Sequence, residues 1–243
     1  MTTPAAAANT PTTNVARPDA PTALLILAKE PIPGRVKTRL SPPCTPVEAA
    51  ELARIALVTT LDAAVRTVAM RPTLVLDGRA GPWLGDHAEI NVIAQSEGGL
   101  ADRIGSAFAS QSGPTVLIGM DTPQVSTAAL DEVIATLRAP GVDAVLGPTD
   151  DGGWWIIGLH DPSLPVFSGI PMSTSTTGAA QAARLRELGL RVATVATERD
   201  VDTFADARIV ARRLPDSDFA RAVAAVEATL RPSLRQRTDP ASG

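Results

Sequence analysis

The chain has a single cysteine, no long apolar run and no secretory signal. With Cys44 as its only cysteine, the chain can form neither an internal disulfide bond nor a metal site with two cysteine ligands. We therefore expect Cys44 to have a structural role and the protein to belong to a reducing compartment. No window approaches the roughly 18 consecutive apolar residues of a membrane span. The first 21 residues lack both the basic and the apolar region of a signal peptide. These absences predict a cytoplasmic protein without a membrane span.

The marks of covalent catalysis and of nucleic-acid binding are also missing. His87 and His160 do not have the spacing of paired metal ligands, and there is neither a Gly-x-Ser-x-Gly motif nor a nucleophile-like context for the cysteine. The 22 basic and 26 acidic residues give a formal charge of −4. This balance indicates neither a nucleic-acid surface nor a polybasic membrane anchor.

What is present suits one α/β domain of residues 22–230, flanked by a disordered tail (1–21) and a loose C-terminal tail (231–243). Runs of strand length alternate with helical stretches, which predicts a mostly parallel sheet with helices on both faces. The expected strands are 23–28, 73–77, 91–94, 115–120, 144–146, 154–159 and 191–195.

Capping residues mark several of the expected helices. Thr45 and Glu48 resemble a capping box for a helix to about Val68, and Ser126 precedes a helix to about residue 138. A third helix, 177–188, ends before Gly189. The apolar stretch 220–230 could form a homodimer contact or belong to the core.

A basic, glycine-containing loop follows the first expected strand. Four residues fall within six positions of it: Gly34, Arg35, Lys37 and Arg39. Free backbone N–H groups and cations at the end of a strand favour an anion, so the loop predicts a phosphate site. A surface turn with exposed cations explains this segment, taken alone, equally well.

Aspartates follow two later strands, at the edge of the sheet where open α/β folds bind ligands. Asp121 is well placed to ligate Mg²⁺, although it could instead cap the next turn. Asp200 and Asp202 precede a predicted helix that either could cap. We expect the extended backbone to point their carboxylates in opposite directions, so that only Asp202 reaches the metal while Asp200 pairs with Arg199.

Two further loops contain glycines. In the segment 150–155, Gly152 and Gly153 would let a ligand approach the backbone, and of Trp154 and Trp155 one ring is expected in the core and the other at a pocket. A hairpin turn with an aromatic anchor is the alternative. The junction 95–103 could read a nucleobase edge through its backbone amides.

Together these motifs resemble the bacterial GT-A-like glycosyltransferase family that includes the arsenosugar-biosynthesis type, which is similar to the guanylyltransferases of coenzyme F420 and molybdenum-cofactor synthesis. The resemblance covers residues 23–214. It rests on Ala-Lys-x-Pro-x-Pro-Gly-Arg-Val-Lys-Thr-Arg-Leu, Gly-x-Asp-x-Pro, Gly-Pro-x-x-Asp-Gly-Gly-aromatic-aromatic-x-Ile-Gly-Leu and Asp-Val-Asp-Thr, in this order. One stretch departs from the family: Met172 stands where the family has tryptophan and Ser175 where it has aspartate.

The resemblance implies a Rossmann-like nucleotide-diphospho-sugar transferase (GT-A) domain. By analogy, Asp121 and Asp202 bind Mg²⁺ or Mn²⁺, and Asp151 faces the acceptor or the transferred group. The residues implied in nucleotide or substrate binding are Gly34, Arg35, Lys37, Arg39, Gln95, Gly99, Gly152 and Gly153, and those implied in catalysis are Lys37, Asp121 and Asp151.

The leading hypothesis is therefore a Mg²⁺-dependent transferase that takes a nucleotide-activated sugar and a small-molecule acceptor. A nucleotidyltransferase that releases pyrophosphate from a nucleoside triphosphate is an alternative, because the three cations of the loop suit a triphosphate. A non-catalytic nucleotide-binding module is a third. The second carboxylate, Asp202, argues against it, because a binding module does not need one.

Overall fold

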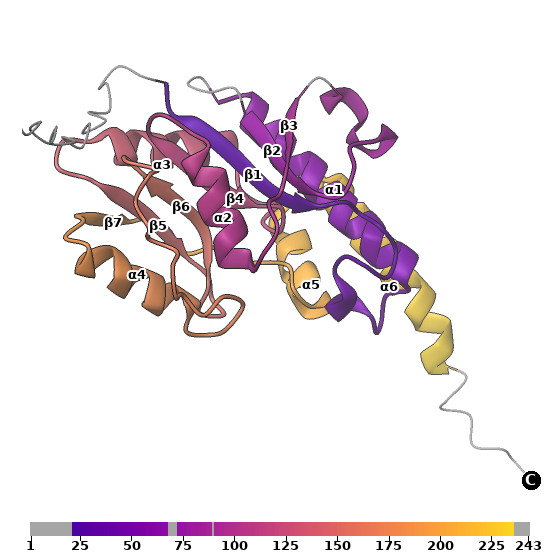
Figure 1. Cartoon of the computed structure of the whole chain (residues 1–243). Helices are drawn as coiled ribbons and strands as arrows, with labels where there is room; N and C mark the ends of the chain where they lie inside the picture. Colours follow the sequence, from indigo (N-terminus) through magenta and orange to yellow (C-terminus); the bar gives the residue numbers. More distant parts are fainter. Residues whose placement is uncertain (1–20, 68–71, 89, 236–243) are drawn as a thin grey trace, which may run out of the picture.

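The computed structural model describes residues 21–67, 72–88 and 90–235, which form a sheet with helices on both faces (Figure 1). Seven strands lie in the order β3-β2-β1-β4-β6-β5-β7. β6 is antiparallel to both of its neighbours, and the other pairs are parallel. The strands are β1 (Ala23–Lys29), β2 (Pro72–Asp77), β3 (Asn91–Ala94), β4 (Thr115–Gly119), β5 (Ala144–Pro148), β6 (Trp154–Leu159) and β7 (Val192–Thr194). The predicted fold class is confirmed, and each expected strand is present with ends that differ by at most two residues.

The helices form a layer on each face of this sheet and an outer pair. α1 (Pro46–Val65) and α3 (Thr127–Arg138) cover one face, and α2 (Leu100–Ala109) and α4 (Thr177–Glu187) cover the other. α5 (Phe204–Arg213) and α6 (Asp218–Arg235) pack on the outer side of α1. Two short 3₁₀ helices are η1 (Thr38–Leu40) and η2 (Pro82–His87).

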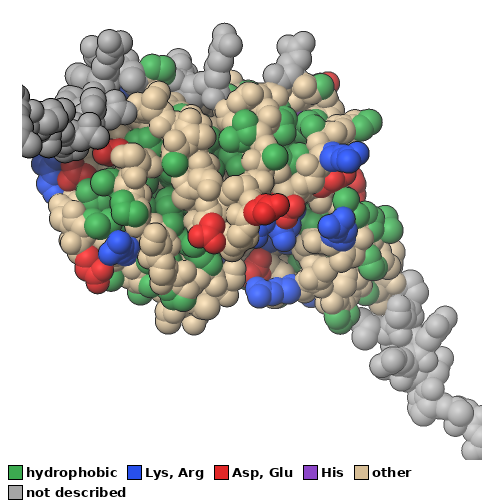
Figure 2. All heavy atoms as spheres, in the orientation of Figure 1, with side chains coloured by type: hydrophobic (Ala, Val, Ile, Leu, Met, Phe, Trp, Pro, Cys, Tyr) green, Lys and Arg blue, Asp and Glu red, His purple; other side chains and the backbone are tan. Residues whose placement is uncertain are grey.

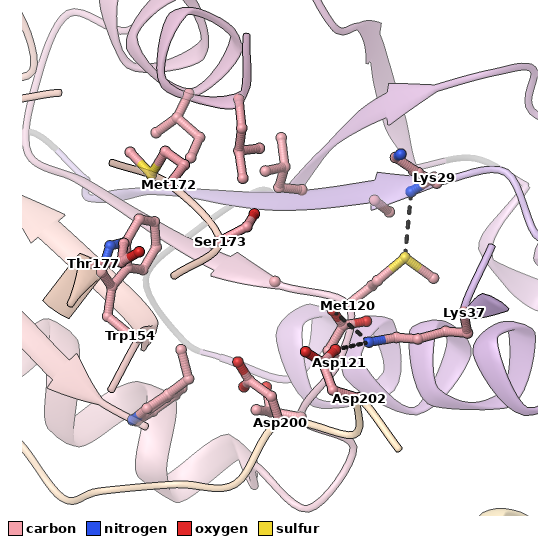
Figure 3. Close-up of a pocket in the computed structure, with 18 of the residues that line it drawn as sticks. Lys29, Lys37, Met120, Asp121, Trp154, Met172, Ser173, Thr177, Asp200 and Asp202 are labelled. Atoms are coloured by element: carbon pink, nitrogen blue, oxygen red, sulfur yellow. Dashed lines mark hydrogen bonds and ion pairs between the residues drawn. The ribbon is translucent and has the colours of Figure 1, made fainter. Parts of the chain in front are cut away.

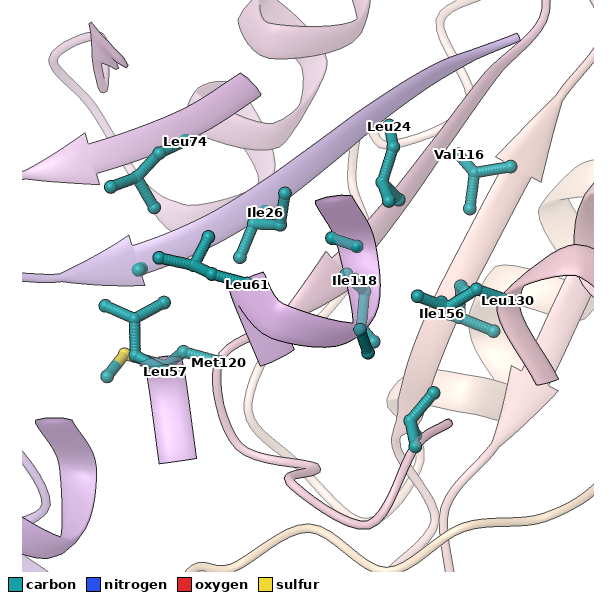
Figure 4. Close-up of a cluster of buried hydrophobic side chains, with 14 of the residues drawn as sticks. Leu24, Ile26, Leu57, Leu61, Leu74, Val116, Ile118, Met120, Leu130 and Ile156 are labelled. Carbon is teal, nitrogen blue, oxygen red and sulfur yellow. The ribbon is translucent and has the colours of Figure 1, made fainter. Parts of the chain in front are cut away.

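The side chains of the central strands alternate between the two layers because successive residues of a strand point to opposite faces. On β1, Leu24 and Ile26 belong to the cluster under α1 and α3, whereas Leu25 belongs to the cluster under α2 and α4. Figure 4 shows the first of these clusters, which contains Leu57 and Leu61 of α1 together with Ile26 of β1 and Ile118 of β4. Burial on both faces explains the almost continuous apolar sequence of β1 and β4.

The expected helix caps are present. The Thr45 hydroxyl accepts a hydrogen bond from Glu48 N at 3.2 Å, and a Glu48 carboxylate oxygen accepts one from Thr45 N at 2.7 Å. The Ser126 side chain caps α3, and Gly189 follows α4 in the left-handed region with φ of 76°. These local signals mark the start of α1 and of α3 and the end of α4. The end of α1 was predicted less well, because the helix ends at Val65 and not near Val68.

The C-terminal helix α6 supports the core alternative for the apolar stretch 220–230. Phe219, Val223 and Val226 are buried against α1 and α5, so the apolar side of this stretch contributes to the core. α6 continues to Arg235, beyond the expected domain end at residue 230. Most of the two expected tails, residues 1–20 and 236–243, lies outside the described residues. No helix within the described ranges is both long and apolar enough to cross a bilayer.

Candidate active site

A cavity of about 690 Å³ opens at the carboxyl ends of β1 and β4. Figure 2 shows this side of the molecule, with acidic and basic side chains next to one another on its surface. Eight of the sequence-predicted site residues line the cavity, namely Arg35, Lys37, Arg39, Gln95, Asp121, Asp151, Gly153 and Asp202. Gly34, Gly99 and Gly152 are not among its lining residues. The basic loop and the two proposed metal ligands therefore meet at one place.

Lys37 bridges the two aspartates at the charged end of the cavity (Figure 3). Its Nζ lies 2.9 Å from Asp121 Oδ2 and 3.0 Å from Asp202 Oδ1. The Lys37 side chain is 11% exposed, and burial opposes its charge, but the two carboxylates outweigh this and raise its pKa above the ordinary value. Arg39 Nη1 adds a contact of 3.2 Å to Asp202 Oδ2.

The two aspartates are brought together by a backbone hydrogen bond between distant segments. Asp121 is the second residue after β4, and its carbonyl accepts a hydrogen bond of 2.9 Å from Val201 N. Val201 is buried, which anchors the segment that carries Asp202. Thr203, not Asp200 or Asp202, is the N-cap of α5 and forms a capping box with Asp206. Asp200 and Asp202 therefore do not cap α5, which the sequence had left open for either of them.

Asp200 corrects the sequence-based expectation. Arg199 pairs with Asp150 at 2.7 Å and with Asp206 at 2.8 Å, not with Asp200, which lines the cavity beside Asp202. Residues two apart in an extended segment share a face, so the expected opposite directions of Asp200 and Asp202 were wrong. Burial raises the pKa of Asp200 to about 8, with Asp121, Asp151 and Asp202 adding to the rise and Lys37 opposing it.

The turn between β5 and β6 forms the adjoining wall. The segment forms a hairpin turn, and the two tryptophans differ in burial: Trp155 is 4% exposed in the core, whereas Trp154 is partly buried at the edge of the core, and both contribute to the lining of the cavity. Asp151 Oδ1 accepts hydrogen bonds from the Thr149 hydroxyl at 2.5 Å and from Gly153 N at 3.0 Å. The Asp151 carboxylate is therefore held in place at the wall.

The glycines of this turn hold a second segment against it. Gly152 has φ of 90°, and a Cβ there would collide with the carbonyl oxygen of Ser175. Gly178 N donates a hydrogen bond of 2.8 Å to Gly152 O, and a Cβ on Gly178 would lie 2.5 Å from Gly153 O. This packing carries Met172 and Ser175, the two departures from the family pattern, into the cavity lining. Figure 3 places Met172 near Trp154, away from the charged end.

The junction after β3 supplies the opposite wall. The Gln95 amide donates to Ala28 O at 2.8 Å and to Val75 O at 3.1 Å, and its oxygen accepts from Arg103 Nη1 at 3.0 Å. Arg103 lines the cavity, and its Nε is buried without a hydrogen-bond partner among the described residues. The Gln95 side chain is thus fixed by the protein, while Arg103 retains a donor for a ligand.

The donor set at the charged end fits a hard divalent cation completed by a ligand. Asp121 Oδ1 is buried and has no hydrogen-bond partner in the described part of the chain, although its other oxygen contacts Lys37. The described residues contain no group of three or more histidine, cysteine or acidic side chains arranged to hold a metal by themselves. Mg²⁺ is commonly bound by one or two carboxylates together with substrate phosphates, which this arrangement allows.

Comparison with known proteins identifies the superfamily to which this fold belongs. A protein of Desulfovibrio desulfuricans G20, provisionally assigned as a nucleotide-diphospho-sugar transferase, is 27% identical over 89% of this chain and 98% of its own, with a TM-score of 0.75. This chain has the nucleotide-diphospho-sugar transferase fold. Residues 58–174 match the model of a bacterial family described as "Uncharacterized protein conserved in bacteria" (DUF2064). The resemblance inferred from the motifs is thereby confirmed at the level of the superfamily.

Two nucleotide-utilising enzymes share the fold at lower identity. A cytidylyltransferase of Leptospira borgpetersenii is 13% identical over 91% of this chain and 99% of its own, with a TM-score of 0.55. CMP:2-keto-3-deoxy-manno-octonic acid synthetase, solved with CTP, is 13% identical over 80% of this chain and 99% of its own, with a TM-score of 0.54. No curated protein matches the chain. These two likenesses show the fold, while the more similar Desulfovibrio protein is provisionally assigned as a transferase, as expected for an enzyme.

Proposed function

We propose that this protein is a divalent-metal-dependent transferase that uses a nucleotide-activated sugar. The observation that carries the proposal is the meeting of the basic loop with the Asp121 and Asp202 carboxylates in one cavity at the end of the sheet. The similarity to the Desulfovibrio protein over nearly its whole length supports the same class of substrate. Arg103 and the junction 95–103 are assigned to the nucleoside portion.

The chain's own residues would act mainly by position and charge. Asp121 and Asp202 would hold the metal, which when bound would offset negative charge on the phosphates. Arg35, Lys37 and Arg39 would stabilise the charge that develops on the departing nucleoside diphosphate, a contribution that is large in a site fixed in advance. Holding donor and acceptor in one geometry would supply much of the remaining rate enhancement.

We assign the wall formed by Asp151, Trp154 and Met172 to the acceptor. The fixed Asp151 carboxylate lies within the same cavity as the proposed phosphate site and is placed to accept a proton from an acceptor hydroxyl. Trp154 and Met172 add an uncharged surface beside it, and the Trp154 indole N–H is buried without a partner among the described residues. An acceptor with an apolar portion and a hydrogen-bond-accepting group fits this wall.

Nucleotidyl transfer is the second candidate, because the three cations Arg35, Lys37 and Arg39 line the cavity and suit a triphosphate. The two candidates differ in what they release. Glycosyl transfer releases a nucleoside diphosphate, whereas nucleotidyl transfer releases pyrophosphate.

A thermal-shift panel tests the proposal. Nucleoside triphosphates and nucleoside-diphosphate sugars are compared with and without Mg²⁺ on the wild type, on Asp121→Asn and on the control Asp86→Asn, an exposed aspartate of η2. A ligand at 100 times its Kd stabilises by about 2.7 kcal/mol, which is readily measured. We expect a Mg²⁺-dependent shift in the wild type and the control that Asp121→Asn loses. The ligand class that gives the shift is then assayed for its released product, and no shift with any nucleotide would contradict the proposal.

A further inference from the structure

The chain contains only two lysines among its 22 basic residues, and both line the cavity. Lys29 is 53% exposed at its side chain and lies 4.0 Å from Asp77. Lys37 is 11% exposed and contacts both Asp121 and Asp202. One lysine is therefore open to solvent, and the other occupies the gap between the two carboxylates.

We propose that the Lys37 ammonium is an internal substitute for the divalent cation, so that the two exclude each other and metal binds well only when nucleotide phosphates draw Lys37 away. The inference deepens the proposed function and rests on the metal site assigned there. It predicts that the nucleotide binds before the metal, an order that neither the family motifs nor the fold implies.

Distances support mutual exclusion. A Mg²⁺ ion fits the unpartnered oxygen Asp121 Oδ1 and would lie about 2.1 Å from it, while Lys37 Nζ lies 2.9 Å from Oδ2 of the same carboxylate. The two cations would then share one carboxylate, and like charges this close in a partly buried site repel each other. Since Lys37 also contacts Asp202, it cannot leave one carboxylate for the other without meeting the same ion.

The backbone of Lys37 indicates that its position is enforced. Its φ of 47° and ψ of 41° place a non-glycine residue in the left-handed region, immediately before η1. Such a conformation costs energy and persists only where the surroundings impose it. The two ion pairs of the ammonium are contacts that can offset this cost. Drawing the ammonium onto phosphates would exchange them for equivalent charge-assisted contacts.

Binding of Mn²⁺ without nucleotide tests the proposal. The full chain and its variants are titrated with Mn²⁺ by calorimetry or by electron paramagnetic resonance of the free ion. Lys37→Met keeps the length of the side chain and removes its charge, and we expect it to bind Mn²⁺ at least tenfold more tightly than the wild type. The matched control Lys29→Met removes the same charge from the same cavity and is expected to change the Kd less than twofold. The double variant Lys37→Met with Asp121→Asn should lose the gain.

Amine labelling of the unmutated protein gives a second readout that does not depend on a variant folding. With mass-spectrometric detection, a small acylating reagent should modify Lys29 readily and Lys37 slowly. Saturating Mn²⁺ alone should raise the Lys37 rate severalfold and leave that of Lys29 unchanged.

Three results would overturn the proposal: a Lys37→Met variant that binds Mn²⁺ no better than the wild type, an equal gain in Lys29→Met, or Lys37 labelling that bound Mn²⁺ does not change. No nucleotide is used in either experiment. Failure here would therefore leave a Mg²⁺-dependent nucleotide shift intact. Absence of that shift would remove the proposed function and the role of nucleotide phosphates in drawing Lys37 away, whereas the competition between lysine and metal is decided by the two experiments above.

Discussion

At the scale of single residues, Cys44 offers a direct check on the packing of the outer helices. It is 4% exposed in the cluster between α1, α5 and α6, and burial, followed by the nearby charge of Glu48, raises the pKa of its thiol to about 11. The thiolate is the reactive form. We therefore predict negligible reaction with an aromatic disulfide reagent at pH 8 in the native protein and one equivalent in denaturant. Rapid stoichiometric reaction of the folded protein would contradict this packing.

The same scale shows where inference from the sequence stopped. The cations and carboxylates of the cavity could be predicted because glycine, proline and charge gather where apolar runs end. Asp200 could have been placed beside Asp202, because residues two apart in an extended segment share a face. Its expected pairing with Arg199 could not be excluded from the sequence, because Arg199 is drawn to Asp150 and Asp206 by contacts that exist only after folding. The sequence analysis singled out Trp154 and Met172 separately but did not place them together. Their proximity depends on how the segment 172–178 packs on the β5–β6 turn.

At the scale of elements, the cavity depends on that packing. Gly152 combines a positive φ with a Cβ position blocked by Ser175, whereas Gly189, with φ of 76°, has open space around it. We predict that Gly152→Ala lowers the free energy of unfolding by more than about 2 kcal/mol, because strain and collision add. The matched control Gly189→Ala has the strain alone and should cost about 1 kcal/mol.

Denaturant titrations of both variants measure the difference. Equal losses in the two variants would show that Ser175 moves aside without cost and that this turn does not hold the segment. Because Ser175 and Met172 line the cavity, Gly152→Ala should also weaken acceptor binding more than it weakens binding of the nucleotide.

The strands and helix caps were predictable because their signals are local. The Thr45–Glu48 capping box and the apolar runs of β1 and β4 need no knowledge of the rest of the chain. The direction and order of the strands depend on long-range pairing. For the turn at 150–155, the sequence left a hairpin, and with it an antiparallel β6, as one of two alternatives. No local signal shows that β6 lies between β4 and β5.

At the scale of the whole molecule, the site is assembled from segments far apart in the sequence. Lys37 follows β1, Asp121 follows β4 and Asp202 precedes α5, and the central position of β1 and β4 in the sheet brings them together. The cavity lies beside the pairing of β4 with the antiparallel β6. A ligand bound there would contact both the parallel half of the sheet and the β6-β5-β7 half, so we expect nucleotide binding to stabilise the domain as a unit.

Global stability should also report a charge pair at the far edge of the sheet. Arg191 donates two side-chain hydrogen bonds to Asp143, of 2.8 and 2.9 Å, and these contacts lower the pKa of that carboxyl to about 2. In the unfolded chain the Asp143 carboxyl has its ordinary, higher pKa. Between about pH 5 and pH 2 the unfolded chain therefore binds more protons than the folded protein, and the free energy of unfolding decreases as the pH is lowered. The contribution of the pair is therefore present above about pH 5 and lost as the pH approaches 2. We predict that Asp143→Asn lowers the Tm at pH 7 and that its difference from the wild type closes over this range. For the control Asp86→Asn, at an aspartate that has no ion pair among the described residues, we expect the Tm to equal that of the wild type at every pH. A Tm difference for Asp143→Asn that does not change with pH would show that the hydrogen bonds of Asp143 contribute to stability and its charge does not.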